Sequence, residues 1–176
     1  DGSVWAWGGN QYGQLGDGTL LSKNMPVKIG SGYSAMDGGF AHSLGLKTDG
    51  TLWAWGDNYN GQLGDGTMVD KKAPVLIDSG YAMIAAGDQH SLALKTDGTL
   101  WAWGANYYGQ LGDGTGVNKN VPVQIGSGFT LIAADYDHSL ALKSDGTLWA
   151  WGSNFYGQLG DGTTIDKYSP VQIGGG

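Results

Sequence analysis

The chain has 176 residues, a net charge of −7 and only 14% charged residues, a composition that excludes a disordered acidic tail. Cys, Arg and Glu are missing from the sequence. The lack of Cys excludes disulfides, thiolate metal sites and cysteine nucleophiles. An acidic chain without Arg argues against a nucleic-acid partner, because it repels phosphates and lacks the guanidinium group that most often binds them.

The chain is an internal repeat. An opening string, DG[ST][VL]WAWG, recurs every 48 residues without insertion or deletion, at Asp1, Asp49, Asp97 and Asp145. We interpret residues 1–176 as a single segment built from the repeats 1–48, 49–96, 97–144 and the partial 145–176. The second and third repeats are identical at 33 of 48 positions, so a specific function is to be sought where they differ.

The first half of each period predicts a strand and an ordered loop. In the second repeat, TLWAWG (51–56) is rich in aromatic and β-branched residues and follows an Asp-Gly turn, which indicates a strand. The stretch NYNGQLGDGT (58–67) has no helical periodicity and reads as a loop. The strand after it starts at Pro74, which suits an outermost edge strand, where a missing N–H costs least.

The second half of each period predicts a hairpin. The segments MIAAG (83–87) and HSLALK (90–95) are apolar and separated by two residues, so we expect them to form the innermost two strands. No window shows a period of 3.6, and the chain is therefore predicted to be all-β.

Four strands per 48 residues, with both faces apolar, are typical of a β-propeller whose blades pack against one another. Trp53 and Trp55 lie on one face of their strand, and Leu52 and Ala54 lie on the other, so neighbouring blades are expected to meet as large against small. We therefore predict that the tryptophans are buried between blades.

Two strings resemble the regulator of chromosome condensation repeat family. IAAGDQHSLAL (84–94) is similar to its signature, and WGxNxxGQLGDGT, present in all four repeats, is similar to its second conserved block. Two residues depart from the signature, Asp37 at a small-residue position and Asp135 in place of the glycine, so those inner hairpins are expected to be altered. The resemblance implies a seven-bladed ring, of which this chain would supply about half, as three full blades of four antiparallel strands plus a half-blade.

The family's known roles include nucleotide exchange on a small GTPase, nucleosome docking, ultraviolet sensing and inhibition of β-lactamases. An acidic chain without Arg suits neither of the first two roles. The light-sensing members carry Trp and then Arg before the histidine, whereas this chain has Phe40-Ala41, Asp88-Gln89 and Tyr136-Asp137. A binder of the inhibitor or adhesin type is what remains.

No constellation in the sequence indicates catalysis, a metal or a cofactor. Repeat-equivalent histidines on successive blades are about 10 Å apart, too far to share a zinc ion, so we expect each of them to bond within its own hairpin. The His90-Ser91 pair cannot form a nucleophile and base, because neighbours on a strand point to opposite faces. The GDGT aspartates supply one carboxylate per repeat, which favours a turn over a calcium site.

Two function classes follow. The first is a non-catalytic binding or scaffold module with a protein or glycan partner. The alternative is a purely structural repeat segment, or a designed or truncated fragment of a larger propeller, without a partner of its own. In an up-and-down blade the hairpin tips and the long loops share one face, and aromatic residues gather in them. The candidate partner-binding residues on this face are Phe40, Asp88, Tyr136, Asp137, Tyr12, Tyr59, Tyr107, Tyr108, Phe155 and Tyr156. Tyr136 and Asp137 are the least repetitive of them and the strongest candidates.

Two further expectations concern the location of the chain and its self-association. The chain has no apolar run of about 18 residues and no leader pattern, so we expect no membrane segment. A secreted or cell-surface location is our working hypothesis, although the sequence has no targeting signal. An open arc of blades leaves a sheet face uncovered at each end, so self-association through these ends is expected, although two copies would not close a ring without a mismatch.

Overall fold

The structure is a computed structural model that describes residues 2–174, and this range holds fourteen β-strands and no helix. The first sheet has two strands, β1 (Val4–Gly8) and β2 (Lys23–Gly30). The second has β3 (Tyr33–Gly38), β4 (His42–Lys47), β5 (Leu52–Gly56) and β6 (Lys71–Asp78). The third has β7 (Tyr81–Ala86), β8 (His90–Lys95), β9 (Leu100–Gly104) and β10 (Lys119–Gly126). The fourth has β11 (Phe129–Asp135), β12 (His138–Lys143), β13 (Leu148–Gly152) and β14 (Lys167–Ile173).

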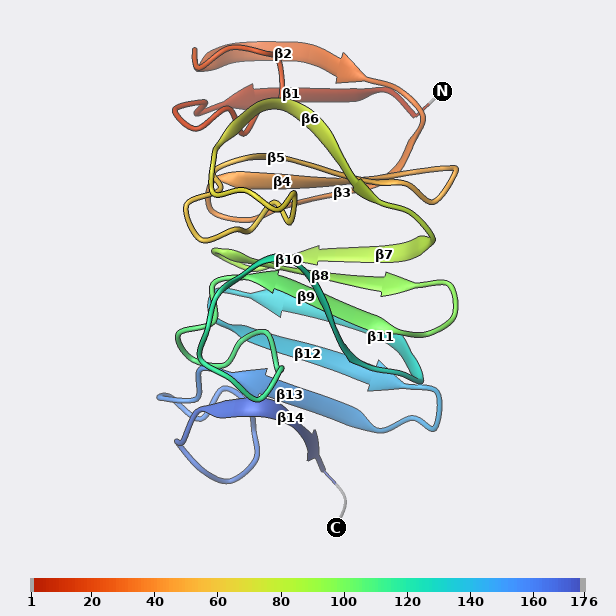
Figure 1. Ribbon diagram of the computed structural model, residues 1–176, viewed down its shortest axis with the longest axis vertical. Coiled ribbons are helices and arrows are strands. Elements are labelled where there is room, and N and C mark those ends of the chain that lie inside the picture. Colours follow the sequence, from red (N-terminus) through yellow and green to blue (C-terminus); the bar gives the residue numbers. More distant parts are fainter. Residues whose placement is uncertain (1, 175–176) are drawn as a thin grey trace.

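The four sheets are stacked in chain order (Figure 1), and each four-stranded sheet is an antiparallel meander. This confirms the predicted all-β blades, three of them complete and one half-blade at β1–β2. The sheets are offset from the sequence repeats, because β3 and β4 come from residues 1–48, whereas β5 and β6 come from residues 49–96. Each complete blade therefore takes one hairpin from each of two successive repeats.

The outermost strand starts earlier than the sequence suggests. Pro74 lies inside β6, which begins at Lys71, and not at its first residue. The pairing with β5 shifts register between Gly56, opposite Lys71, and Ala54, opposite Val75. Pro74 lies within this irregularity on an edge strand, where no ladder hydrogen bond needs its missing N–H.

Large side chains of one sheet pack against small and branched ones of its neighbour. Trp103 is fully buried and packs against Leu44, Leu52 and Ala54 of the preceding sheet. The interface before Trp151 repeats this arrangement. Trp5 and Trp7 of the two-stranded sheet depart from the expectation, since 53% and 60% of their surfaces are exposed.

A polar clasp crosses each interface between complete sheets. The backbone carbonyl of Gln62, in the loop after β5, accepts hydrogen bonds from the Trp103 indole and the Ser91 hydroxyl of the next sheet, both at 2.8 Å. Because Ser91 gives its only hydrogen to this carbonyl, its oxygen accepts from His42 Nε2 of the preceding sheet, at 3.0 Å. The same clasp joins the following two sheets through Gln110, Trp151, Ser139 and His90.

The clasp corrects one prediction about the histidines. We expected His42 and His90 to bond within their own hairpins, and both instead bond a serine of the next sheet. The reason lies in strand alternation, because His90 points towards the following sheet while Ser91 points towards the preceding one. The residues that the structure describes contain no group of three or more His, Cys or carboxylate side chains arranged to hold a metal ion.

The two departures from the repeat signature have different effects on the inner hairpins. Asp37 leaves the pairing of β3 with β4 intact and extends its carboxylate to accept from the backbone N–H of Ala86 in the next sheet, at 2.9 Å. Asp135 does alter its hairpin, since it pairs with His138 and extends β11 by one residue. The turn is thereby shortened to Tyr136 and Asp137.

Buried asparagines order the long loops from within. Asn58 is fully buried, and its side-chain Nδ2 donates to the Asp65 carboxylate and to the carbonyls of Thr67 and Val69, while its Oδ1 accepts from the backbone N–H of Leu63. Asn10, Asn106 and Asn154 do the same in the other loops. The Asp65 carboxylate also pairs with the Lys71 ammonium at 3.0 Å, so this aspartate acts in the turn that the sequence indicates.

Removing the serine of the clasp should destabilise the chain. Ser91→Ala deletes the donor to the Gln62 carbonyl and leaves the His42 ring without an acceptor in a buried interface, which should lower the free energy of unfolding by about 1–3 kcal/mol. Urea denaturation measures this difference. The exposed Ser79→Ala is the matched control, and equal losses for the two variants would contradict the clasp.

Acid should weaken the fold through the same residues. Burial lowers the pKa of His42 to about 4 and that of His90 to about 3, below the ordinary 6.5. The unfolded chain therefore binds more protons than the folded chain below pH 6.5. The stability that the neutral histidines allow at pH 7 is lost as the pH falls from 6.5 towards these values, by about 1.4 kcal/mol for each histidine and each pH unit.

Denaturation curves between pH 7 and pH 4.5 measure this loss above the range in which most carboxylates titrate. The variant His42→Gln with His90→Gln should flatten the slope, because it removes both buried imidazoles. The control Ser79→Ala changes no titratable group and should keep the wild-type slope. A slope that the double variant leaves unchanged would contradict the assignment.

Candidate functional site

The hairpin tips and the long loops lie on one face of the stack, which we call the loop face. Asn60, in the loop after β5, donates to the side chain of Gln89 at the tip between β7 and β8, at 2.8 Å. Gln110, in the loop after β9, donates to Asp137 at the next tip, at 2.9 Å. In Figure 1 the long loops project to the left, whereas the short Asp-Gly turns lie at the right, which is the turn face.

All ten residues predicted for partner binding lie in the tips and long loops of this face. Five of them are more than two-thirds exposed: Phe40 74%, Tyr59 79%, Tyr136 68%, Phe155 72% and Tyr156 86%. Tyr12, Tyr107 and Tyr108 are 40–55% exposed. Asp88 and Asp137 are half-buried beside the tips. The loop face therefore exposes several large aromatic side chains to solvent.

The three hairpin tips are tied to one another by their backbones. Phe40 N–H donates to the Asp88 carbonyl at 3.1 Å, and Asp88 N–H donates to the Tyr136 carbonyl at 2.9 Å. Tyr136 has a φ of 32°, the only positive value at a non-glycine position among residues 2–174. This strained backbone is held by the bond to Asp88, so the Tyr136 ring is displayed from a fixed position.

Two tip carboxylates lie close together. Burial raises the pKa of Asp137, and the negative charge of Asp88 raises it further. Burial also raises the pKa of Asp88. The centre of the loop face is therefore acidic, with a repulsion that a positively charged ligand would relieve.

Tyr107 has a structural role that its exposure alone does not reveal. Its hydroxyl donates to Asn60 Oδ1 of the preceding loop at 2.8 Å and accepts from Asn118 Nδ2 at 3.1 Å. Asn118 Nδ2 also donates to Asn60 Oδ1, at 3.0 Å. Tyr107 thus holds two loops together, whereas no such bond is made by Tyr59, its repeat equivalent.

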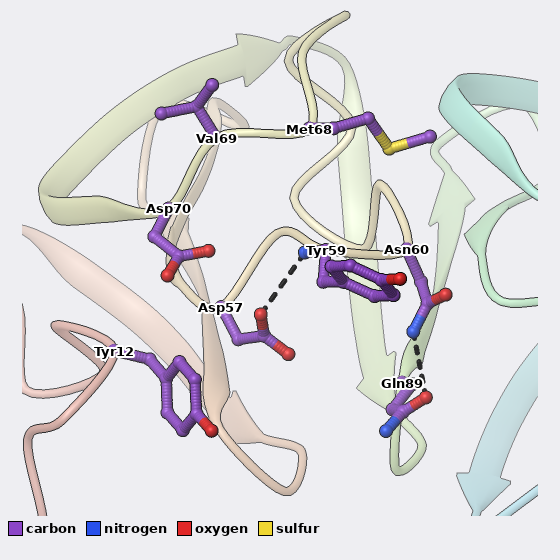
Figure 2. Close-up of a pocket in the computed structure, with 8 residues that line it drawn as sticks. All are labelled: Tyr12, Asp57, Tyr59, Asn60, Met68, Val69, Asp70 and Gln89. Atoms are coloured by element: carbon purple, nitrogen blue, oxygen red, sulfur yellow. Dashed lines mark hydrogen bonds between the residues drawn. The ribbon is translucent and has the colours of Figure 1, made fainter.

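A cleft of about 640 Å³ opens at the Tyr59 position, and we call it the first loop cleft (Figure 2). Its lining residues are Tyr12, Asp57, Tyr59, Asn60, Met68, Val69, Asp70 and Gln89. The Asp57 carboxylate accepts from the backbone N–H of Tyr59 and from Gln62, and Asp70 accepts from the backbone N–H of Asn58. Burial raises the pKa of Asp57, and the neighbouring Asp70 charge raises it further.

A second cleft of about 610 Å³ lies two repeats further along. Tyr108, Phe155, Tyr156 and Asp166 line it, together with Tyr136 and Asp137 of the adjacent tip. The rings of Phe155 and Tyr156 meet edge to face, with centroids 4.8 Å apart. The strongest sequence candidates therefore border a cavity.

The sequence reasoning missed the polar residues of the first loop cleft, Asp57, Asp70 and Gln89, because it searched for aromatic residues. The sequence nonetheless marks these three positions, because each of them differs between the second and third repeats. The third repeat carries Ala105, Asn118 and Asp137 at the three equivalent positions.

The turn face shows how this fold holds an ammonium group. Lys95 Nζ lies 2.9 Å from the Asp78 carboxylate and 4.9 Å from the ring centroids of both Tyr81 and Trp101. Lys47 and Lys143 each lie between two rings in the same way. These lysines are part of the folded framework. Among the described contacts, no lysine lies over an aromatic ring on the loop face.

The loop face offers rings, carboxylates and amides, which suit non-covalent recognition. Two of the three histidines next to the tips, His42 and His90, are hydrogen-bonded in the clasps. Within residues 2–174 there is also no helix long and apolar enough to cross a membrane.

Comparison with known proteins matches two family models, both described as the regulator of chromosome condensation (RCC1) repeat. One covers residues 27–62, 84–110 and 129–158, and the other covers residues 1–37, 49–94 and 145–176. No match was found among curated protein sequences.

Solved structures of the same architecture superpose on nearly the whole chain. Human WBSCR16 is 25% identical with a TM-score of 0.86, over 99% of this chain and 49% of that one. Yeast RCC1 (Prp20) bound to Kap60 is 25% identical with a TM-score of 0.84, over 99% and 45%. Prp20p from Saccharomyces cerevisiae, described with its binding to Gsp1p and histones, is 28% identical with a TM-score of 0.83, over 99% and 47%. The chain thus spans about half the length of these proteins.

Proposed function

Because the chain belongs to the regulator of chromosome condensation repeat family, we propose that it is a non-catalytic binding module whose loop face recognises a protein or glycan partner. The observation that carries this proposal is the concentration of exposed rings on one face, around two clefts, while the turn face uses its rings to hold its own lysines. Residues 1–176 act in it as one unit.

The relatives are consistent with a binding role. The solved structures of the yeast relative describe it with Kap60, with Gsp1p and with histones, all of which are proteins. The net charge of −7 and the absence of Arg favour a protein or glycan over a nucleic acid for this chain. Tyr and Phe suit such a surface, since they supply large contact areas at a low cost in rotamer freedom.

The purely structural alternative has one observation in its favour. Tyr107, one of the ten candidates, uses its hydroxyl to hold two loops together. We therefore assign recognition chiefly to the rings that make no such bond, and above all to Tyr136 with its neighbour Asp137.

Selection of ligands on the intact chain tests the proposal. Peptides from a random display library and glycans on an array are first selected for binding to the wild-type chain. These ligands should lose at least about 1 kcal/mol of affinity for the variant Tyr136→Ala with Asp137→Ala. The reason is that both side chains border the second cleft. Calorimetry measures the affinity, and thermal unfolding checks that the variant is folded.

The matched control is Asp97→Ala with Ser127→Ala on the turn face. Ligands that bind the loop face should bind this control as they bind the wild type. Loss of affinity in the control, with none in the Tyr136 and Asp137 variant, would place recognition on the turn face and contradict the proposal.

We also propose that a chain of this sequence self-associates head to tail. The Trp55 indole, 1% exposed, donates to the Gln14 carbonyl at 2.9 Å, whereas its equivalent Trp7 is 60% exposed. At the other end of the stack, Gln158 is the equivalent of Gln14. A second copy that brings its Gln158 carbonyl to Trp7 would repeat an interface that the fold already makes within the chain.

Light scattering coupled to size exclusion measures this association. At micromolar concentration the wild type should have an apparent mass above 18.3 kDa, and Trp7→Ala should shift it towards that value, because the variant removes apolar surface and the indole donor. A wild-type chain that elutes only at 18.3 kDa would contradict the proposal.

A further inference from the structure

The first loop cleft contains two carboxylates and no cationic side chain. The Asp57 and Asp70 carboxylates both line the cleft and are drawn beside each other in Figure 2, and none of the eight lining residues is a lysine. Both aspartates are absent from the ion pairs of residues 2–174, whereas every GDGT aspartate is paired with a lysine. The cleft therefore holds negative charge that the fold leaves uncompensated.

The next repeat shows what the equivalent atoms do when their bonds are complete. Asn118 occupies the position of Asp70, and its Oδ1 accepts from the backbone N–H of Asn106 as Asp70 Oδ1 accepts from that of Asn58. Its other atom, Nδ2, donates to Asn60 and to the Tyr107 hydroxyl. In Asp70 the matching atom is the acceptor Oδ2, and no described residue donates to it. The loop of the second repeat thus has an acceptor without a described donor, Asp70 Oδ2, where the loop of the third repeat has a hydrogen-bonded donor, Asn118 Nδ2.

Aromatic rings complete the surroundings of this acceptor. Tyr12 and Tyr59 line the cleft, and Figure 2 shows the Asp57 carboxylate between them with the Asp70 carboxylate beside it. Tyr59 is 79% exposed, and its hydroxyl makes no bond of the kind that fixes Tyr107. The Tyr59 ring therefore lines the cleft with most of its surface open to solvent and to a ligand.

Two rings with a carboxylate are also what this fold uses to hold an ammonium group. On the turn face, Lys95 Nζ is placed between the rings of Tyr81 and Trp101, at 4.9 Å from each, and pairs with the Asp78 carboxylate. The first loop cleft has the same components, with one carboxylate more, but lacks the lysine. A primary ammonium brings three donors, a full positive charge and affinity for ring faces.

We propose that the first loop cleft binds a lysine side chain of a protein partner, with the ammonium between the Asp57 and Asp70 carboxylates and the stem against Tyr12, Tyr59 and Met68. This inference rests on the proposed binding function of the loop face and narrows its partner to a protein with an exposed lysine. A neutral glycan would leave both carboxylate charges uncompensated, which is why the charge favours a protein.

Titration with a minimal lysine probe tests the inference. The probe is Nα-acetyl-lysine methylamide, followed by amide NMR of the folded chain. The backbone N–H groups of Asn58 and Tyr59 donate directly to the Asp70 and Asp57 carboxylates, so their signals should shift and saturate. The same compound acetylated on its ε-amino group should cause no saturable shift, because it has no charge.

A double variant that the fold already tolerates removes the site. Asp57→Ala with Asp70→Asn installs the residues found at Ala105 and Asn118, and it should weaken binding of the lysine probe by about tenfold or more. The charge-matched control is Asp49→Asn with Asp97→Asn on the turn face, which should retain the wild-type affinity within about twofold, since distant exposed charges are screened.

Three results would overturn the inference. They are a lysine probe that gives no saturable shift, an equal loss of binding in the turn-face control, and equal or tighter binding of the arginine analogue or of a neutral oligosaccharide at the same amides. The proposed function of the loop face is tested separately through Tyr136 and Asp137, which do not line this cleft. Failure of the lysine site therefore leaves that test standing.

Discussion

A single backbone carbonyl in each of the first three long loops, that of Gln14, Gln62 or Gln110, controls how the sheets meet. The Gln62 carbonyl receives an indole and a hydroxyl from the next sheet, and this serine in turn accepts from a histidine of the preceding sheet. Each of these groups is buried, so a missing partner would leave a polar atom unsatisfied in an otherwise apolar interface. The clasp therefore fixes the distance and register of neighbouring sheets, and it anchors the long loop that carries the carbonyl.

The loop face owes its shape to this anchoring. Gln62 holds the loop from the sheet side, and the buried Asn58 holds it from within, so that the loop backbone is ordered by residues common to all four repeats. Other loop positions vary around these two anchors, and Asp57, Asn60, Met68 and Asp70 all differ between the second and third repeats. A rigid loop backbone with variable side chains suits recognition, because the loop is ordered on folding and its ordering entropy does not reduce the binding affinity.

The local sequence predicted the strands, their order and the two faces, because alternation and turn residues are properties of neighbouring residues. It did not predict what depends on contacts between sheets. The serine partner of His42 lies 49 residues away, and the Asp37 carboxylate finds a backbone N–H equally far along the chain. It also missed the cleft carboxylates, since the free acceptor of Asp70 becomes apparent only against the bonded amide of Asn118. The lesson is that near-identical repeats supply an internal reference once their structure is known.

The offset between sheets and repeats has a consequence for cooperativity. Every complete sheet joins two successive repeats through backbone ladders, as β4 with β5 and β8 with β9. A repeat of 48 residues is consequently a unit of duplication but not a unit of folding, because neither of its hairpins has a complete sheet until the adjacent repeat is in place. Local unfolding of one repeat would break strand pairing with both the preceding and the following repeat. The coupling free energy between neighbouring repeats therefore includes main-chain hydrogen bonds, in addition to the side-chain contacts that join most stacked repeats. Mechanical load or thermal opening should therefore spread over adjacent repeats together.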